Sequence, residues 1–311
     1  MTHQKTMSRV AVLLLNFNLP EMTDRLVEQI RRNTSWPYEL FLLDNGSEET
    51  NVTQYATYTL AKNIGMNGGI NHLWSLVKDR DDFDGYWFLC NDIVLDEGRD
   101  YLEEMATLYS SLSERFPVAC ITPSYHYEGK RVVPPFMSKR EGGTWRPIVW
   151  VEWNAFLVSR QTMLELFPNG FEISTKHAFQ DVVLNYEGWM NGFGSFIMDD
   201  LSIEHIENQT FLKHGGRTVN GVLIPDYEGL EKMLVSDMQV VEAQYAHRGI
   251  DLRQMRELLH DDIDVAGDFE KYLLAGHRPR PAGSIKWSLH KRWRRALGAA
   301  RVRSGRKRAR R

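Results

Sequence analysis

The sequence has few cysteines and no long apolar stretch. Two of its 311 residues are cysteines, Cys90 and Cys120, which is too few for the disulfide framework of a small secreted domain. Cys90 lies inside an apolar run, so we interpret both thiols as small buried hydrophobes in a reducing compartment. No apolar stretch approaches the roughly 20 residues that span a bilayer, and the N-terminus lacks a signal-peptide core. These absences predict a cytoplasmic protein.

Acidic residues are absent from the last part of the chain. Residues His277 to Arg311 include 14 Lys and Arg and no Asp or Glu. Of the 38 basic residues, 24 therefore remain to balance all 41 acidic ones, so the rest of the chain carries −17 although the net charge is −3. A basic tail on an acidic body indicates an anionic partner for the tail.

Three short apolar runs each stop at a cluster of polar residues and glycine. They are Val10–Leu15 before Asn16-Phe17-Asn18, Leu40–Leu43 before Asp44-Asn45-Gly46-Ser47, and Tyr86–Cys90 before Asn91-Asp92. Continuous apolar runs separated by segments of helical period are typical of parallel strands buried on both faces. Ligands of open α/β sheets bind at the carboxyl ends of the strands, where these clusters lie.

The alternation of strands and helices continues over residues 8–207. Helices are predicted over Leu19–Arg32, Asn67–Val77, Asp100–Leu112, Gln161–Leu166 and Phe179–Met190. Further strands are expected at Val118–Ile121, Trp150–Val158, Ser195–Met198 and Leu201–Ile206, with a mobile loop or an irregular hairpin over Tyr125–Arg146. Beyond Thr210 the pattern is helical and acidic without a strand signal, over Tyr227–Arg248 and Leu252–Leu274. This predicts a helical appendage over residues 208–276, followed by the basic tail over 277–311.

The pair Asn91-Asp92 is the first candidate for a functional role. A carboxylate just past a buried strand costs stability unless it is solvated, paired or bound to metal. Hard divalent cations such as Mg²⁺ and Mn²⁺ prefer oxygen ligands and are commonly shared between carboxylates and a phosphate group. The alternative is a helix N-cap or a turn, the commoner role of an isolated Asn-Asp pair.

Four other candidates each allow two interpretations. Asp44-Asn45-Gly46-Ser47 could read a nucleotide or form an ordinary Asn-Gly turn. Asn63–Gly69 could present amides to a diphosphate or form a flexible loop before a helix, and its glycine spacing matches neither the dinucleotide fingerprint nor the P-loop. Asp181 opens a predicted helix, where a carboxylate is an ordinary N-cap. His205 closes a predicted strand, where a partly buried imidazole is the alternative to a metal ligand.

Taken in order, these residues resemble the motifs of the family 2 glycosyltransferases, which have the GT-A fold, and especially of their rhamnosyltransferase-like branch. The similar segments are Val12–Asn18, Leu42–Ser47, Asn63–Asn71, Phe88–Ile93, Trp153–Arg160 and Phe179–Asp181, with His205 where the family often has a metal-ligating His. The resemblance implies an α/β GT-A domain over residues 8–207, Rossmann-like with a mostly parallel sheet flanked by helices. The helical appendage and the basic tail would follow it.

The resemblance also implies a role for each candidate residue. Contacts with a nucleotide sugar are expected from Asn16, Asn18, Asp44, Asn45, Asn63, Gly65, Asn71, Asn91 and Asp92. Contacts with the acceptor are expected from Trp153, Asn154 and Gln180. Asp92 and His205 would hold a divalent cation, Mn²⁺ or Mg²⁺. Asp181 would be the catalytic base that takes the proton of an acceptor hydroxyl as its oxygen attacks the anomeric carbon, with inversion.

The implied activity is metal-dependent, non-processive sugar transfer to a glycan, a lipid-linked glycan, a protein or a modified nucleic acid. Gln180 replaces the usual Glu, Ser159-Arg160 has one basic residue instead of two, and the absence of Gln-x-x-Arg-Trp after Asp181 argues against a processive polymerase. A nucleotidyltransferase is the alternative enzyme, although Asn16–Glu21 lacks the Lys or Arg expected after its first strand. The non-enzyme alternative is a basic-tailed binding protein on a degenerate transferase scaffold, against which retention of the catalytic and metal candidates argues.

The basic tail includes a segment with amphipathic spacing. Ser284–Ala300 has apolar residues at four-residue intervals among Lys and Arg, namely Ile285, Leu289, Trp293 and Leu297. Such a helix can lie in the headgroup region of an anionic membrane, which would place the protein at the inner membrane face. The Arg-rich end could equally hold nucleic acid through its phosphates. A disordered solvated tail is the third interpretation of residues 284–311.

Overall fold

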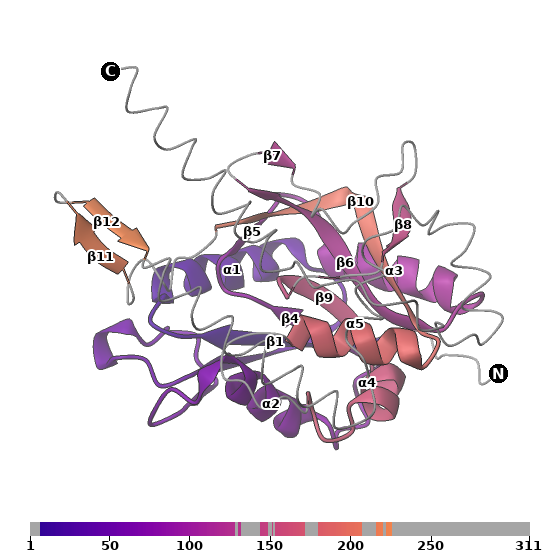
Figure 1. Ribbon diagram of the computed structural model, residues 1–311, viewed down its shortest axis with the longest axis horizontal. Coiled ribbons are helices and arrows are strands. Elements are labelled where there is room, and N and C mark those ends of the chain that lie inside the picture. Colours follow the sequence, from indigo (N-terminus) through magenta and orange to yellow (C-terminus); the bar gives the residue numbers. More distant parts are fainter. Residues whose placement is uncertain are drawn as a thin grey trace, which may run out of the picture.

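The computed structural model describes residues 7–127, 130–131, 144–148, 151, 153–171, 180–206, 216–219 and 222–225. Within these ranges, the chain forms a central sheet flanked by helices (Figure 1). The strand order along the sheet is β3-β2-β1-β4-β9-β6-β10-β5, and two short strands, β7 and β8, pair with β6 and β10.

The first half of the sheet is parallel. Its strands are β1 (Val10–Asn16), β2 (Tyr38–Asp44), β3 (Tyr58–Thr59) and β4 (Gly85–Leu89). β1 lies between β2 and β4 and is buried from Val10 to Leu14, as a strand covered on both faces requires. The register places Asn16 beside Asp44, so the polar clusters after β1 and β2 meet at one edge of the sheet, as predicted.

The second half of the sheet mixes strand directions. Its strands are β9 (Ala155–Ser159), β6 (Val118–Tyr127), β10 (Gly194–His205), β5 (Ile93–Leu95), β7 (Lys130–Arg131) and β8 (Trp145–Ile148). β9 is antiparallel to β4 and β6, whereas β6 and β10 are parallel. The short β5 is antiparallel to β10, and this pairing sets His205 opposite Ile93, the neighbour of Asp92.

Five α-helices and one short 3-10 helix are described. They are α1 (Pro20–Asn33), α2 (Gly65–Val77), α3 (Tyr101–Ser113), α4 (Arg160–Leu166), α5 (Gln180–Met190) and η1 (Glu49–Asn51). In Figure 1, α1 lies above β1 and α2 lies below it. α1 begins at Pro20, where a missing amide hydrogen costs no helical bond. Among the residues that the structure covers, no helix combines the length and apolar character needed to cross a membrane.

Most predicted elements are confirmed, with differences at their ends. α2 begins at Gly65 instead of Asn67. β10 is one strand with a bulge between Met198 and Ser202, where two strands were expected, because a bulge lets pairing continue across the break in the apolar pattern. β9 begins at Ala155, while the Trp150 end of that predicted segment lies outside the described residues. β8 occupies the end of the segment predicted to be a mobile loop or an irregular hairpin.

A hairpin differs from the helical pattern expected beyond Thr210. β11 (Gly216–Val219) pairs antiparallel with β12 (Val222–Pro225). The sequence signal is the pair Asn220-Gly221 between two apolar stretches, which is typical of a two-residue hairpin connection. The helices predicted over residues 227–248 and 252–274, and the basic tail over 277–311, lie outside the described residues.

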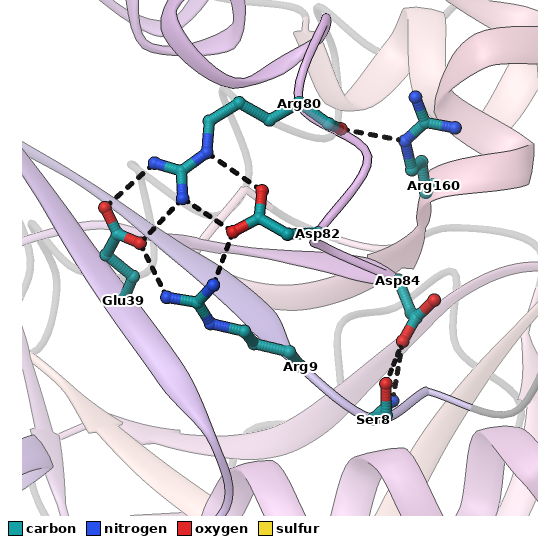
Figure 2. Close-up of polar contacts among 7 residues, drawn as sticks. All are labelled: Ser8, Arg9, Glu39, Arg80, Asp82, Asp84 and Arg160. Atoms are coloured by element: carbon teal, nitrogen blue, oxygen red, sulfur yellow. Dashed lines mark hydrogen bonds and ion pairs between the residues drawn. The ribbon is translucent and has the colours of Figure 1, made fainter.

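The amino-terminal edge of the parallel strands is charged (Figure 2). The Arg80 guanidinium donates hydrogen bonds to Glu39 at 2.9 Å and to Asp82 at 2.9 and 2.7 Å, and Arg9 pairs with the same two carboxylates. The bond from Arg80 lowers the pKa of Asp82. Both guanidinium groups lie over the ring of Phe83, at 5.0 Å for Arg9 and 4.4 Å for Arg80. The network joins the starts of β1, β2 and β4, at the edge opposite the polar clusters.

Candidate active site

Asp44 at the end of β2 is fully buried and accepts three hydrogen bonds. Its Oδ2 accepts from Asn16 Nδ2 at 2.6 Å and from Ser47 Oγ at 2.8 Å, and its Oδ1 accepts from the Ser47 amide at 2.8 Å. These donors satisfy a carboxylate that is removed from water. Gly46 permits the turn, because its φ is +73° and a Cβ there would lie 2.2 Å from the carbonyl carbon of Lys62. The segment Asp44–Ser47 is therefore a turn in which the amide and the hydroxyl of Ser47 donate to the Asp44 carboxylate.

Asn18 connects the end of β1 to the same turn. It adopts the left-handed backbone conformation, with a φ of 56°, which asparagine tolerates better than most residues. Its Oδ1 accepts a hydrogen bond from the Glu48 amide at 2.8 Å, and its own amide donates to Ser47 Oγ at 2.8 Å. The ends of β1 and β2 thus form one connected polar edge.

The loop before α2 is attached to this edge through Asn45. Asn45 Nδ2 donates to Asn63 Oδ1 at 3.2 Å and to the Gly65 carbonyl at 3.0 Å, and Asn45 Oδ1 accepts from the Ile64 amide at 3.2 Å. Asn63 Oδ1 also accepts from the Gly65 amide at 2.7 Å. Asn63 itself is exposed, whereas Asn45 is buried. The predicted loop residues therefore lie together beside the strand ends.

Asn71 lies with a different neighbour. Its Nδ2 donates to the Phe171 carbonyl at 3.0 Å, and its Oδ1 accepts from the Phe171 amide at 2.8 Å. This amide joins α2 to the segment after α4. The structure thus places Asn71 with the backbone of Phe171 and not with the amides at the strand ends.

Asn91 after β4 joins the polar edge through a residue that the sequence analysis did not single out. Its Nδ2 donates to Thr23 Oγ1 at 3.0 Å and lies 3.3 Å from Asn16 Oδ1. Thr23 belongs to α1, is fully buried, and donates to Asn16 Oδ1 at 2.8 Å. No motif marks Thr23 in the sequence, because its role depends on contacts with two strand ends.

Asp92 and His205 are brought together by the pairing of β5 with β10. Asp92 Oδ1 lies 3.4 Å from His205 Nε2, and their side chains are 19% and 14% exposed. The Asp92 carbonyl accepts a hydrogen bond from the Ile206 amide at 2.8 Å. In the described part of the chain, no group of three or more His, Cys, Asp and Glu residues is placed to hold a metal ion. Asp92 and His205 are the two residues that the sequence analysis predicts to hold a cation, and under that prediction we call them the metal pair; a carboxylate oxygen and an imidazole nitrogen are both ligand types that suit Mn²⁺.

Asp181, in the first turn of α5, and Asp92 both influence the pKa of the Cys90 thiol. The pKa of the Cys90 thiol is raised well above its usual value, first by burial and then by the carboxylates of Asp92 and Asp181. Both carboxylates therefore act electrostatically on the thiol that follows β4. Cys90 Sγ donates to the Trp153 carbonyl at 2.8 Å. The predicted base and the predicted metal ligand thus both contribute to the raised pKa of one partly buried thiol.

Asn185 fixes the start of α5. It is fully buried, and its amide exchanges two hydrogen bonds of 3.0 Å with the backbone of Val151 while donating to the Asp181 carbonyl at 2.6 Å. The sequence analysis missed this residue, although its position four residues after Asp181 places it on the same helix face. Gln180 is the first residue of α5, and its side chain lies outside the described residues.

Trp153 and Asn154 precede β9 beside Cys90. The Trp153 ring centroid lies 4.5 Å from Phe156, 5.1 Å from Phe171 and 5.5 Å from Phe88, and the residue is 8% exposed. Asn154 is 6% exposed, and within the described structure its Nδ2 has no hydrogen-bond partner. A buried donor without a partner is costly, which makes Asn154 a candidate to bind a ligand oxygen.

Comparisons with known proteins agree with this geometry at the level of the fold. No protein-family model matches the sequence, and no curated protein matches it. The chain is similar to the crystal structure of GalNAc-T7 with UDP, GalNAc and Mn²⁺, with 14% identity and a TM-score of 0.51 over 91% of this chain and 60% of that chain. It also aligns with S. aureus TarS 1–349, with 12% identity and a TM-score of 0.47 over 66% of this chain and 62% of that one.

The similarity to GalNAc-T7 establishes the GT-A glycosyltransferase fold. The predicted α/β class, with a mostly parallel central sheet and flanking helices, is confirmed. The chain spans only about 60% of the length of these structures. The family 2 assignment and the rhamnosyltransferase-like branch stay predictions.

Proposed function

We propose that this chain is a metal-dependent glycosyltransferase that moves a sugar from a nucleotide-diphosphate donor to an acceptor hydroxyl, with inversion. The observation that supports this most is the approach of Asp92, His205 and Asp181, from three distant segments, to the ends of the central strands. That edge is where open α/β sheets bind ligands. The GT-A fold is consistent with the same location.

The donor nucleotide would bind along the polar edge of β1 and β2. Asn16, Asn18, Asp44 and Asn45 are almost fully buried and bonded to one another or to the turn. We therefore assign them the task of fixing the turn and the loop that face the nucleotide. Asn63 is exposed in that loop and is left to contact the donor directly.

The metal pair would hold a divalent cation, Mn²⁺ or Mg²⁺. One carboxylate oxygen and one imidazole nitrogen suit Mn²⁺ and leave coordination positions for the donor diphosphate and water. When bound, the cation would neutralise the charge that develops on the leaving diphosphate. GalNAc-T7 was crystallised with Mn²⁺, so Mn²⁺ is the first ion to test.

Asp181 would accept the proton of the acceptor hydroxyl. Its bond partner Asn185 and the contacts of Asn185 with Val151 hold the first turn of α5 in place, which fixes the direction from which the carboxylate approaches. Trp153 and Gln180 would line the acceptor side. The unpartnered Nδ2 of Asn154 would donate a hydrogen bond to a sugar hydroxyl bound there.

The test is a panel of UDP-, GDP- and dTDP-sugars, each with Mn²⁺ and with a chelator. We expect one donor class to raise the melting temperature and to be hydrolysed slowly to free nucleoside diphosphate, only when the metal is present. Release of pyrophosphate instead would indicate a nucleotidyltransferase. No shift and no hydrolysis with any donor would contradict the proposal.

We further propose that residues 284–311 carry the enzyme to an anionic surface. The motive is the charge of the sequence, with 14 basic and no acidic residues from His277 to Arg311. An anionic membrane and nucleic acid both satisfy that charge, and the two differ in whether the apolar spacing around Trp293 contributes. A comparison of the two surfaces, set out among the predictions below, decides between them.

A further inference from the structure

Thr23 is a buried hydroxyl that stands between the donor edge and the metal pair. Its Oγ1 lies 2.8 Å from Asn16 Oδ1, 2.9 Å from the Leu19 carbonyl and 3.0 Å from Asn91 Nδ2. A hydroxyl has one hydrogen and two lone pairs. It therefore donates to Asn16 Oδ1 or to the Leu19 carbonyl, and it accepts from Asn91 Nδ2 at 3.0 Å, a shorter contact than the 3.3 Å between Asn91 Nδ2 and Asn16 Oδ1.

The hydrogen bonds of Thr23 connect the polar ends of β1 and β2 to the segment Asn91-Asp92. Toward the donor edge, Asn16 Nδ2 donates to Asp44 Oδ2, and the same oxygen accepts from Ser47 Oγ. Toward the metal pair, Asn91 is followed directly by Asp92. A continuous line of side-chain hydrogen bonds thus runs from Ser47 to the residue before the candidate metal ligand.

Asn91 and Asp92 are held from opposite sides of the sheet end. The Asn91 side chain is bound by Thr23 of α1, while the Asp92 carbonyl accepts from the Ile206 amide beyond β10. Two residues that are fixed at separate points leave the intervening backbone little freedom. Removing either attachment would let the Asp92 carboxylate depart from its place opposite His205.

We propose that Thr23 is a positioning residue, whose hydroxyl holds the Asn91 amide and thereby sets the Asp92 carboxylate against the donor edge. This inference rests on the proposed function for its effect on metal and donor binding. The mechanical part, that Thr23 orders the segment from Asn91 to Ile93, concerns the chain alone. It would give α1 a part in ordering the candidate site.

The experiment compares Thr23→Val, which keeps the shape and removes the hydroxyl, with Thr23→Ser, which keeps the hydroxyl. The matched control is Thr162→Val. Thr162 is equally buried at the start of α4, and its Oγ1 bonds to the Val118 carbonyl at 2.9 Å and to Ser159 Oγ at 2.8 Å, away from the site. Both valine variants lose one buried hydroxyl on a helix, so a general loss of stability affects them alike.

The first measurement is hydrogen exchange of the native protein without ligand. Thr23→Val should speed exchange in peptides that cover Asn91–Leu95 and the amide of Ile206, while Thr162→Val and Thr23→Ser should leave both regions at the wild-type rate. Unchanged exchange in Thr23→Val overturns the inference, whatever the protein binds.

The second measurement is the affinity for UDP with Mn²⁺, read by calorimetry and by the electron paramagnetic resonance signal of free Mn²⁺. We expect Thr23→Val to bind about tenfold more weakly and the other two variants to stay within about twofold of wild type, as the loss of one buried hydrogen bond predicts. Equal weakening in Thr162→Val would overturn the inference. If wild type binds no UDP with Mn²⁺, the proposed function fails in that form, and hydrogen exchange still decides the role of Thr23.

Discussion

The amide of Asn71 and the backbone of Phe171 form a reciprocal pair of hydrogen bonds, at 3.0 and 2.8 Å. The pair joins α2, which follows the donor-side loop, to the segment that carries Phe171 into the aromatic cluster under Trp153. Gly170 makes the approach possible, because its φ is +92° and a Cβ there would lie 2.5 Å from Asn71 Oδ1. One asparagine therefore joins α2 to the segment that carries Phe171, two parts of the chain that we propose face the donor and the acceptor.

Gly170→Ala should destabilise the protein more than Gly192→Ala. Gly192 has a φ of +81° but nothing within 4 Å of its hypothetical Cβ, so its substitution reports backbone strain alone. We expect about 1 kcal/mol for that strain and roughly 1–3 kcal/mol more for Gly170→Ala, from the lost Asn71 contacts. Urea unfolding of both variants measures the difference. Equal free energies of unfolding would show that the Asn71 pair adds nothing to stability.

Asp92→Asn should abolish the gain in melting temperature that the donor and Mn²⁺ produce together. The amide keeps the size of the carboxylate but lacks the charge that binds a hard cation. The fold should survive, because Asp92 is partly exposed. The control is Asp96→Asn, an exposed carboxylate just beyond β5, which should behave like wild type. A wild-type thermal shift in Asp92→Asn would remove Asp92 from the metal pair.

Asp181→Asn should keep the donor affinity and lower kcat by about 10²–10⁴-fold, because an amide cannot take the acceptor proton. The measurement is donor binding by calorimetry beside initial rates of transfer. The Asn185 bond uses the backbone carbonyl of Asp181, so the variant leaves that attachment of α5 intact. A parallel loss of donor binding would identify Asp181 as a structural cap instead.

Both cysteines should be unreactive in the native protein. Burial raises the pKa of Cys120 to about 12, and desolvation, with the carboxylates of Asp92 and Asp181, raises the pKa of Cys90 well above its usual value. Native protein at about pH 8 should therefore modify slowly with a thiol reagent, since the thiolate is the reactive form. Denatured protein should expose both thiols at once. Rapid modification of the native protein would contradict the raised pKa of both thiols.

The same shift predicts how stability depends on pH. A thiol in the unfolded chain ionises near its ordinary pKa of about 8.5, whereas Cys120 stays neutral in the folded chain. The neutral Cys120 thiol therefore contributes fully to the free energy of unfolding below about pH 8.5. That contribution is lost as the pH rises from there toward the folded pKa. Between about pH 8 and 10, Cys120→Ala should lose roughly 2 kcal/mol less stability than wild type. Identical slopes in urea unfolding would contradict this.

Removing residues 284–311 should leave donor hydrolysis intact and weaken binding to the surface that the tail recognises. Liposomes with anionic lipid and duplex DNA are compared at two salt concentrations. Binding to liposomes that persists at high salt, and that falls when Trp287 and Trp293 are replaced by Ala, would identify a membrane partner. Salt-sensitive binding to DNA that is indifferent to both tryptophans would identify nucleic acid. Binding to neither surface at low salt would contradict a role in docking.

The parallel half of the fold could be predicted from the sequence because its signals are local. Val10–Leu15 and Leu40–Leu43 are apolar without interruption, and the polar residues that follow them meet once the strands pair in register. Local signals do not show which distant segments of the chain pair with one another. The contact of His205 with Asp92 needs β10 to run beside β5, which no local period encodes, and it was expected only from a family resemblance.

The hydrogen-bond partners of the predicted donor-binding residues Asp44 and Asn71 could not be read from the sequence. Both oxygens of Asp44 accept hydrogen bonds, two from Ser47 in the turn and one from Asn16 at the end of β1, and its contact with a nucleotide stays a prediction. Asn71 was expected beside the donor, and its partner is a backbone segment that lies far along the chain. Many groups along the chain could form a hydrogen bond with a given polar side chain. The sequence alone does not show which of them the fold brings within reach.

The position of β10 in the chain sets the order in which the site can be completed during synthesis. β1, β2, β4 and their polar ends all precede Ile93, whereas β10 is the last strand of the central sheet to leave the ribosome. Domains tend to form from their N-terminal parts as the chain emerges. In a nascent chain, the contact of Asn16 with Asp44 can thus form before His205, the partner of Asp92, has been synthesised. Translation of β10 would be the step that brings His205 beside Asp92 at an edge whose polar contacts have already formed.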